Sequence, residues 1–347
     1  MEHLIQVELT GLNRPTKVNR EKTKMRRLVT QLAAAAACIA GTAGGALAEP
    51  VNISDFNLNP RIAAKIAAGE ELNIYVSYPD VSNEFAPFVL EGVARADAMD
   101  GITATVIGPV GPDADLQIDQ IETLLDTMDG LAIASVSTDA LAPLLNRMID
   151  EGIPVIAYNT DNPASKRLVF AGQDLVQSGR EAGKLMGEVL GKGKVIITTL
   201  NAAAQWSLDR EQGAREGLAA FPDIEVVSTL NTGTEPQEIY GAIENAMLAN
   251  PDVTGILSLE CCSTPAAGTW VERNDAKGRV HVVGFDLLDL TVDHIADGYI
   301  DATIDQDPER QGFEAVNLLA QFLHGETIDD IDTGVKIYTS ANIDELK

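Results

Sequence analysis

Polar and aromatic side chains recur in this sequence directly after short apolar runs, where their types could bind a small ligand. Two carboxylates, Glu260 and Asp286, follow the runs 255–259 and 280–285. The other positions of this kind are Asn83 and Phe85 after the run 73–78, Asn159 and Asp161 after 155–158, Trp206 and Arg210 after 194–200, and Gln306 after 302–305.

This set of side chains suits a neutral ligand that carries many hydroxyl groups. Carboxylates accept hydrogen bonds, amides donate and accept, and a guanidinium only donates. Ligand hydroxyl groups therefore find partners both as donors and as acceptors. Aromatic rings pack against the C–H faces of a sugar ring. One arginine among several acids argues against a phosphorylated ligand. Each position has an alternative role as the N-cap of the next helix, and Asp139 and Ser178 are interpreted as caps only.

Signatures of catalysis and of metal binding are missing. The sequence has no GxGxxG after its first apolar run, no Walker loop and no GxSxG elbow. Beyond residue 48, histidine occurs only at 281, 294 and 324; we expect His281 within a strand and His294 and His324 on exposed helix faces. No pair of them has zinc spacing. We therefore predict no catalytic residue, no metal site and no cofactor.

The elements that must position these side chains alternate between two periodicities. Continuous apolar runs predict strands buried on both faces, and segments with apolar residues at helical spacing predict the helices between them. Strands are expected at 73–78, 103–108, 131–134, 155–158, 168–171, 194–200, 224–229, 255–259, 280–285, 302–305 and 335–338. Helices are expected near 85–96, 116–128, 141–149, 177–190, 209–220, 236–249, 265–273, 290–297 and 308–323. This alternation predicts an α/β protein with two doubly wound, mostly parallel sheets, and ligands bind such sheets at the carboxyl ends of their strands.

Composition excludes one class of function. The 347 residues include 52 acidic and 25 basic ones, which argues against nucleic-acid binding.

The first 48 residues predict export of the protein. Two arginines after Met25, an apolar stretch at 28–39 and small residues at 44–48 predict a signal peptide over about 25–48, with Met25 as the true start. An Ala-rich membrane anchor and a lipid-modified Cys38 are the alternatives. No later stretch is long and apolar enough to span a membrane.

Two adjacent cysteines, Cys261 and Cys262, remain beyond the leader. They are too few for a disulfide framework. In an oxidising compartment they could form a strained vicinal disulfide. The alternative is a pair of small buried thiols beside a strand end.

Four motifs in order carry a resemblance over roughly residues 72–338. They are GIPVI at 152–156, SLDREQGAREG at 207–217, VVGFD at 282–286 and ATIDQDP at 302–308. The chain resembles the periplasmic sugar-binding proteins of ABC importers, in the subclass similar to ribose-binding protein. The repressors that share this core carry a helix-turn-helix at the N-terminus, which this sequence lacks.

The resemblance implies the type I periplasmic binding protein fold, in which two lobes are joined by three crossovers. The N-terminal lobe would comprise residues 49–173 and 307–334, and the C-terminal lobe residues 174–306 and 335–347. Ligand contacts are implied at Asn83, Phe85, Arg210, Asp286 and Gln306, all of which are also strand-end positions.

Departures from ribose binders indicate a different pocket. Asn159-Thr160-Asp161 stands where ribose binders have an Asp-Arg pair, Ala86 replaces a second Phe, and Glu260 lies near the position of an Asn. Trp206 could supply the second aromatic face, or it could be a surface residue.

The function implied by the resemblance is capture of a sugar or polyol between the lobes and its delivery to an ABC transporter permease, by a monomeric periplasmic protein. A receptor that docks on a membrane sensor or chemoreceptor is the alternative, because the same closure would serve both. An exported enzyme on this scaffold is the third possibility.

Overall fold

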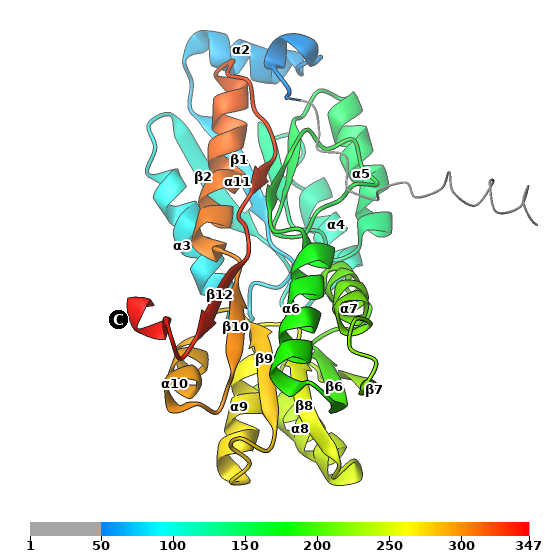
Figure 1. Cartoon of the computed structure of the whole chain (residues 1–347). Helices are drawn as coiled ribbons and strands as arrows, with labels where there is room; N and C mark the ends of the chain where they lie inside the picture. Colours follow the sequence, from blue (N-terminus) through cyan, green and yellow to red (C-terminus); the bar gives the residue numbers. More distant parts are fainter. Residues whose placement is uncertain (1–49, 347) are drawn as a thin grey trace, which may run out of the picture. The chain divides into compact units, whose positions relative to one another are not determined.

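Two six-stranded sheets organise the described part of the chain, residues 50–346 of the computed structural model (Figure 1). Both sheets belong to one compact unit. The predicted leader, its cleavage point after Ala48, and Cys38 lie outside the described residues.

The first sheet is parallel throughout and has the strand order β11-β5-β4-β3-β1-β2. Helix α11 packs on α3, and Figure 1 shows this pair on the opposite side of the sheet from α4 and α5. The strands are β1 (Leu72–Ser77), β2 (Ile102–Ile107), β3 (Gly130–Ile133), β4 (Val155–Tyr158), β5 (Phe170–Gly172) and β11 (Ile331–Asp332). The helices are α2 (Pro60–Ala68), α3 (Ala86–Asp97), α4 (Ala114–Glu122), α5 (Thr138–Asp150) and α11 (Pro308–Leu323).

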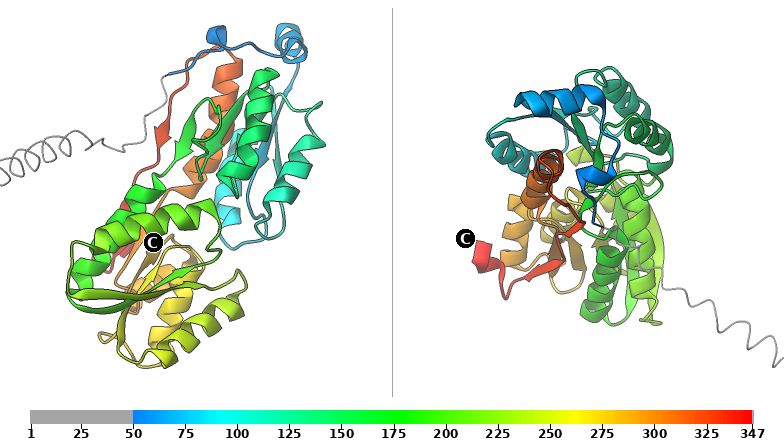
Figure 2. Two further views of the ribbon diagram at one scale, coloured as in Figure 1. Left: turned by 90° about the vertical axis from the view of Figure 1, so that its right-hand side faces the viewer. Right: turned by 90° about the horizontal axis from the view of Figure 1, so that it is seen from above.

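The second sheet has the order β12-β10-β9-β8-β6-β7 and is parallel except at its edge, where β12 runs antiparallel to β10. Helix α6 packs along α7, and α9 contacts α8 and α10; Figure 2 shows these elements from two further sides. The strands are β6 (Gly193–Thr199), β7 (Ile224–Asn231), β8 (Val253–Ser258), β9 (His281–Phe285), β10 (Ala302–Asp305) and β12 (Lys336–Thr339). The helices are α6 (Leu175–Leu190), α7 (Gln205–Leu218), α8 (Pro236–Ala249), α9 (Ser263–Arg273) and α10 (Asp289–Asp297).

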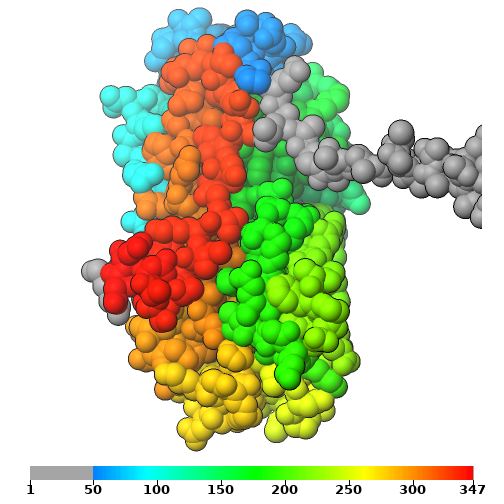
Figure 3. Space-filling view, in the orientation of Figure 1, coloured from blue at the N-terminus to red at the C-terminus, as the bar shows by residue number. Residues whose placement is uncertain are grey.

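The chain ends with a short helical turn, η3 (Ile343–Leu346), which contacts α10. Figure 3 shows this C-terminal segment (red) on the surface beside the orange part of the chain. The first described turn, η2 (Ile53–Asp55), is held near Gly325, because Asn52 Nδ2 donates to the Gly325 carbonyl at 3.0 Å.

Two capping predictions were wrong. Ser137, not Asp139, caps α5, because its side chain accepts from the Ala140 N–H; Asp139 lies in the first turn. Asp174 caps α6 by accepting from the Gln177 N–H. Ser178 lies inside that helix, where its hydroxyl donates to the Leu175 carbonyl. Both true caps have extended backbone, the conformation that frees a side chain to reach the helix N–H groups.

Glycines let two helix pairs pack backbone to backbone: α11 with α3 beside the first sheet, and α7 with α6 beside the second. A Cβ on Gly312 of α11 would lie 1.9 Å from the Val89 carbonyl oxygen of α3. A Cβ on Gly213 of α7 would lie 1.9 Å from the Val176 carbonyl oxygen of α6. Any larger residue would have to separate these helices, so the tight packing fixes where α7 presents its first turn.

Three crossovers join the two sheets: one between β5 and α6, one between β10 and α11, and one between β11 and β12. The buried side chain of Gln173 ties them together, since its Nε2 donates to the carbonyls of Gly334 at 2.8 Å and Asp305 at 3.4 Å. Gln311 adds a second tie, donating to the Gln306 carbonyl at 2.8 Å and to Thr333 Oγ1 at 3.1 Å. The crossovers therefore form one hydrogen-bonded cluster beside the strand ends.

Candidate functional site

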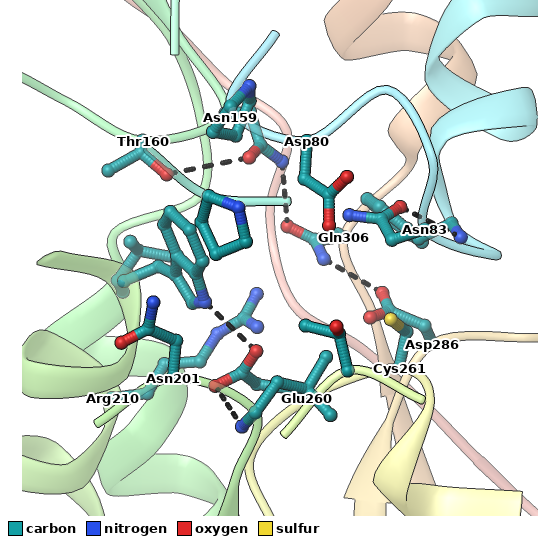
Figure 4. Close-up of a pocket in the computed structure, with 17 residues that line it drawn as sticks. Asp80, Asn83, Asn159, Thr160, Asn201, Arg210, Glu260, Cys261, Asp286 and Gln306 are labelled. Atoms are coloured by element: carbon teal, nitrogen blue, oxygen red, sulfur yellow. Dashed lines mark hydrogen bonds between the residues drawn. The ribbon is translucent and has the colours of Figure 1, made fainter. Parts of the chain in front are cut away.

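A cleft lies between the carboxyl ends of the strands of the two sheets (Figure 4). Every residue that lines it follows a strand or lies in the first two turns of the next helix. The lining residues are Pro79, Asp80, Asn83, Phe85, Pro112, Asn159, Thr160, Leu175, Leu200, Asn201, Trp206, Arg210, Thr234, Glu260, Cys261, Asp286 and Gln306. Eight of the nine residues predicted from the sequence are among them, and Asp161 is not.

On the side of the first sheet, Asn83 shapes the entry to α3. Its Oδ1 accepts from the backbone N–H groups of Phe85 at 3.1 Å and Ala86 at 2.7 Å, which places the buried Phe85 ring at the cleft. Asp80, which sequence reasoning missed, joins two loops in the same way. Its Oδ1 accepts from the Ser82 and Gly111 N–H groups, both at 3.0 Å. These two side chains therefore hold the wall, with part of their hydrogen-bonding capacity already used.

On the side of the second sheet, Glu260 is buried at the end of β8 and accepts three hydrogen bonds. The donors are the Leu200 N–H at 3.1 Å, the Trp206 Nε1–H at 2.9 Å and the Ser207 hydroxyl. Burial raises the pKa of Glu260, and the hydrogen bonds from Ser207 and Trp206 oppose that rise. Because the carboxylate anchors the indole, Trp206 lies against the cleft wall rather than on the open surface.

Arg210 projects from the second turn of α7 and is 4% exposed. Its guanidinium carbon lies 4.2 Å from the centre of the Phe285 ring, and Nη1 donates to the Leu259 carbonyl at 3.0 Å. Its Nε is buried without a hydrogen-bond partner among the described residues. A buried N–H that lacks a partner costs free energy, so this arginine is prepared to donate to a bound oxygen.

Asp286, Gln306 and Asn159 form a hydrogen-bonded line across the cleft (Figure 4). Gln306 Nε2 donates to Asp286 Oδ1 at 2.8 Å, and Asn159 Nδ2 reaches Gln306 Oε1 at 3.5 Å and Gln311 Oε1 at 2.7 Å. Burial raises the pKa of Asp286 to about 7, against the opposing charge of Arg210. The line joins the end of β9 to the end of β4, so it connects the two sheets.

Backbone conformation supports the special position of these residues. Asn159 and Asp286 have φ values of 58° and 70°, in the left-handed region that Asn and Asp enter more easily than other side chains. Residues held in this region cluster at ligand-binding sites. The identity of a strand-end residue as Asn or Asp is therefore a local signal for a sharp turn that leaves the strand at the cleft.

Asp161 lies away from the cleft, contrary to expectation. Its carboxylate is held by Arg167, whose Nη2 donates to Oδ2 at 2.7 Å and whose Nε donates to Oδ1. The two residues belong to the turn between β4 and β5, and Arg167 also faces Asp330. Because the ion pair uses both carboxylate oxygens, we omit Asp161 from the proposed ligand contacts.

Two further predictions concern histidine and cysteine. His294 was expected at the surface but is 4% exposed; its ring packs against Tyr299, and Nε2 lies 3.1 Å from Thr269 Oγ1. His281 lies in β9 and contacts Asp301. Cys261 and Cys262 are both buried, and no disulfide bond joins them in this structure. Within residues 50–346, no cluster of His, Cys, Asp or Glu has the geometry of a metal site.

The model of the periplasmic binding protein domain matches residues 74–327 of this chain. The chain belongs to the periplasmic binding protein family. Every residue that lines the cleft falls within the matched range. The strands of both sheets do so too, except for the first two residues of β1 and the strands β11 and β12. No helix in residues 50–346 is both long enough and apolar enough to cross a membrane.

Several sugar-binding proteins are similar in sequence. The xylose/arabinose-binding protein XylF of Sulfolobus acidocaldarius is 32% identical over 237 residues, which cover 62% of this chain and 58% of that protein. This chain thus spans little more than half the length of that relative. The D-ribose/D-allose-binding protein of Pseudomonas aeruginosa is 28% identical over 64% of this chain and 72% of its own length.

A solved solute-binding protein has the same fold. The solute-binding protein of an ABC transporter from Burkholderia graminis, in complex with D-arabinose, superposes with a TM-score of 0.75 and 28% identity. The match covers 79% of this chain and 97% of the other. The expected fold, two parallel-sheet α/β lobes joined by three crossovers, is therefore confirmed.

Proposed function

We propose that this protein is an extracytoplasmic solute-binding protein, which captures a sugar or polyol between its lobes and delivers it to an ABC transporter permease. One observation carries the proposal: hydrogen-bonding side chains from the strand ends of both sheets meet at a single cleft, and Arg210 Nε is buried there without a partner. A ligand oxygen that accepted a hydrogen bond from Arg210 Nε would place the rest of the ligand within reach of the strand ends of the other sheet.

The chemistry of the cleft favours a neutral, hydroxyl-rich ligand. Arg210 is the one basic residue among the lining side chains, and Asp80, Glu260 and Asp286 are acidic. A phosphate group would meet these carboxylates at close range, which is unfavourable. Phe85 and Trp206 offer flat apolar surface for the C–H face of a sugar ring. Because the relatives above include proteins named for arabinose, xylose and ribose, pentoses are the first candidates.

The mechanism is a change in the population of open and closed forms. The N-terminal lobe comprises residues 49–173 and 307–334, the C-terminal lobe comprises 174–306 and 335–347, and the crossover cluster around Gln173 acts as the hinge. A ligand that binds both lobes binds the closed form better and shifts the population toward it. The closed form then presents both lobe surfaces to the permease. The protein acts as a periplasmic monomer and releases its ligand unaltered.

A sensor or chemoreceptor partner in place of the permease is the second candidate, because the same closure exposes the same paired surfaces. Pull-down experiments with the closed, liganded protein against the permease and against sensor ectodomains distinguish the two. Recovery of the permease alone supports transport, and recovery of a sensor alone supports signalling.

The decisive experiment is a thermal-shift screen of the chain from Glu49 onward over pentoses, hexoses, cyclic polyols and a sugar phosphate. A ligand at 100 times its Kd should stabilise the protein by about 2.7 kcal/mol. We expect a clear rise in melting temperature with one neutral sugar and none with the phosphate. No rise with any neutral sugar would contradict sugar binding, and conversion of the bound sugar to a product would identify an enzyme instead.

A further inference from the structure

The cleft wall contains two adjacent thiols whose sulfur atoms nearly touch. Cys261 and Cys262 follow β8 and lead into α9, and their exposed fractions are 6% and 7%. The Sγ atoms are 2.8 Å apart, well inside the ~3.5–4.0 Å of ordinary van der Waals contact between heavy atoms. Cys261 lines the cleft, and Figure 4 shows it among the residues around Asp286.

We propose that Cys261 and Cys262 form a reversible vicinal disulfide in the cleft wall, and that the oxidised form is the one that binds sugar tightly. The second half of this inference rests on the proposed function. In the reaction, two S–H bonds break and one S–S bond forms. The two protons and two electrons pass to an incoming disulfide, of a small molecule or of a thiol–disulfide oxidoreductase, which leaves as two thiols.

The geometry requires little movement for this reaction. A disulfide bond is about 2.0 Å long, so less than about 1 Å separates the present positions of the sulfurs from bonding distance. The surrounding turn is already fixed, because the hydroxyls of Ser263 and Thr264 donate to the Glu260 carbonyl at 3.1 and 3.0 Å. Closure of the bond would strain this turn, because adjacent Cα atoms are about 3.8 Å apart and most disulfides join Cα atoms about 4.4–6.8 Å apart. Such strain makes a disulfide easier to reduce, so the link would be reversible.

Oxidation would change the chemistry of the cleft wall. The Cys261 thiol is a weak hydrogen-bond donor, whereas a disulfide has no donor and presents polarizable sulfur. Such a surface suits the C–H face of a sugar ring. The link would also restrain the residue after Glu260, whose carboxylate holds Trp206 and Ser207. Preorganisation of this kind raises affinity by reducing the ordering cost of binding.

Burial limits when the exchange can occur. The hydrogen bond with the Cys262 thiol and burial raise the pKa of Cys261, so little of the reactive thiolate forms in the folded, closed protein. We therefore expect exchange to take place in the open form or during folding. A bound sugar, which closes the cleft, should slow reduction of the disulfide.

Mass spectrometry tests the disulfide itself. The chain is secreted into an oxidising compartment, denatured without reductant and treated with iodoacetamide; Cys261 and Cys262 are its two cysteines once the leader is removed. We expect no alkylation and a mass lower by two hydrogen atoms, with both cysteines alkylated after prior reduction. Alkylation of both cysteines without reduction would overturn the proposal.

Calorimetry with D-arabinose and D-xylose tests the binding role. We expect the reduced protein to bind at least about fivefold more weakly than the oxidised protein, as a loss of preorganisation predicts. The Cys262→Ala variant keeps the cysteine that lines the cleft but cannot form the bond. Its affinity should match that of the reduced protein and should not respond to reductant.

Equal affinities of the oxidised and reduced proteins would overturn the binding role. If neither state binds any sugar of the thermal screen, the proposed function fails and the binding role fails with it. The mass measurement decides the existence of the disulfide independently of that result.

Discussion

The guanidinium of Arg210 lies 4.2 Å from the centre of the Phe285 ring, so the side chain that faces the cleft rests on a buried ring of β9. Phe285 is fully buried and immediately precedes Asp286. The sheet itself thus supports the arginine, and a ligand finds both the donor and the carboxylate already in place.

Replacement of Arg210 by Ala should strongly reduce stabilisation by the ligand. Hydrogen bonds to charged groups contribute roughly 1.5–3 kcal/mol each, so affinity should fall by about 10- to 150-fold. The melting temperature without ligand should fall by only a few degrees, since the substitution also removes the contact with Phe285. Arg215→Ala is the matched control, because Arg215 is on the same helix but is paired with Glu211 at the surface. A large loss of stability without ligand would instead identify Arg210 as a structural residue.

Affinity should depend on pH through Asp286. Burial raises its pKa to about 7, and ligand hydroxyls donate best to the ionised carboxylate. Below that pH a proton must leave on binding, so affinity should fall by up to about tenfold per pH unit. Calorimetry at several pH values measures this. Asp286→Asn should bind weakly at every pH and lose the dependence, and an affinity of the native protein that is constant from about pH 5.5 to 8 would contradict the assignment.

The same group makes the stability of the unliganded protein depend on pH in the opposite sense to most carboxylates. The folded-state pKa exceeds the ordinary value of 3.8, so between about pH 4 and 7 the folded protein keeps a proton that the unfolded chain releases. Its contribution to stability is therefore present at low pH and is lost as the pH rises through 7. Urea unfolding measures this. The free energy of unfolding of the native protein, relative to that of Asp286→Asn, should fall as the pH rises from about 4 to 7.

Gln205 of α7 links the second sheet directly to residues that follow β3 of the first sheet. Its Oε1 accepts from Thr138 Oγ1 at 3.1 Å, and its backbone N–H donates to the Val136 carbonyl at 3.3 Å. Gln205→Ala removes the first bond, worth about 1 kcal/mol, and should shift the population toward the open form. We expect a roughly fivefold weaker affinity and a larger radius of gyration by solution scattering. Gln212→Ala, an exposed position on the same helix, is the control; unchanged affinity and radius for Gln205→Ala would exclude a latch.

Close packing of α6 against α7 should make Gly213 intolerant of a side chain. A Cβ there would approach the Val176 carbonyl oxygen to 1.9 Å, so Gly213→Ala should destabilise the protein by ~1–3 kcal/mol. Gly241→Ala is the matched control, since a Cβ there meets nothing within 4 Å. Alanine at a helix interior should stabilise by ~0.5–1 kcal/mol. Urea unfolding measures both changes, and equal stability of the two variants would contradict the packing argument.

Local sequence determined the elements and much of the site. Apolar runs predicted the strands. Ligands bind parallel sheets at the carboxyl ends of the strands, and eight of the nine residues chosen by that rule line the cleft. Strand-end Asn159 and Asp286 carried a further signal, because their left-handed backbone suits Asn and Asp. The rule missed Asp80 and Thr160, although each also follows a strand, because polar residues in loops are too common to be selective.

Only the tertiary structure decided which polar groups are already paired. Asp161 and Arg167 are six residues apart, yet no pattern shows that the turn between them folds the guanidinium onto the carboxylate and away from the cleft. The sequence predicted that His294 lies on an exposed helix face, but its ring is buried against Gly268. A Cβ at Gly268 would lie 2.6 Å from the His294 ring, so only glycine leaves room for the ring there. Periodicity and strand ends are properties of neighbouring residues and can be read along the chain. Pairing and burial depend on which distant segments meet, and packing alone sets that.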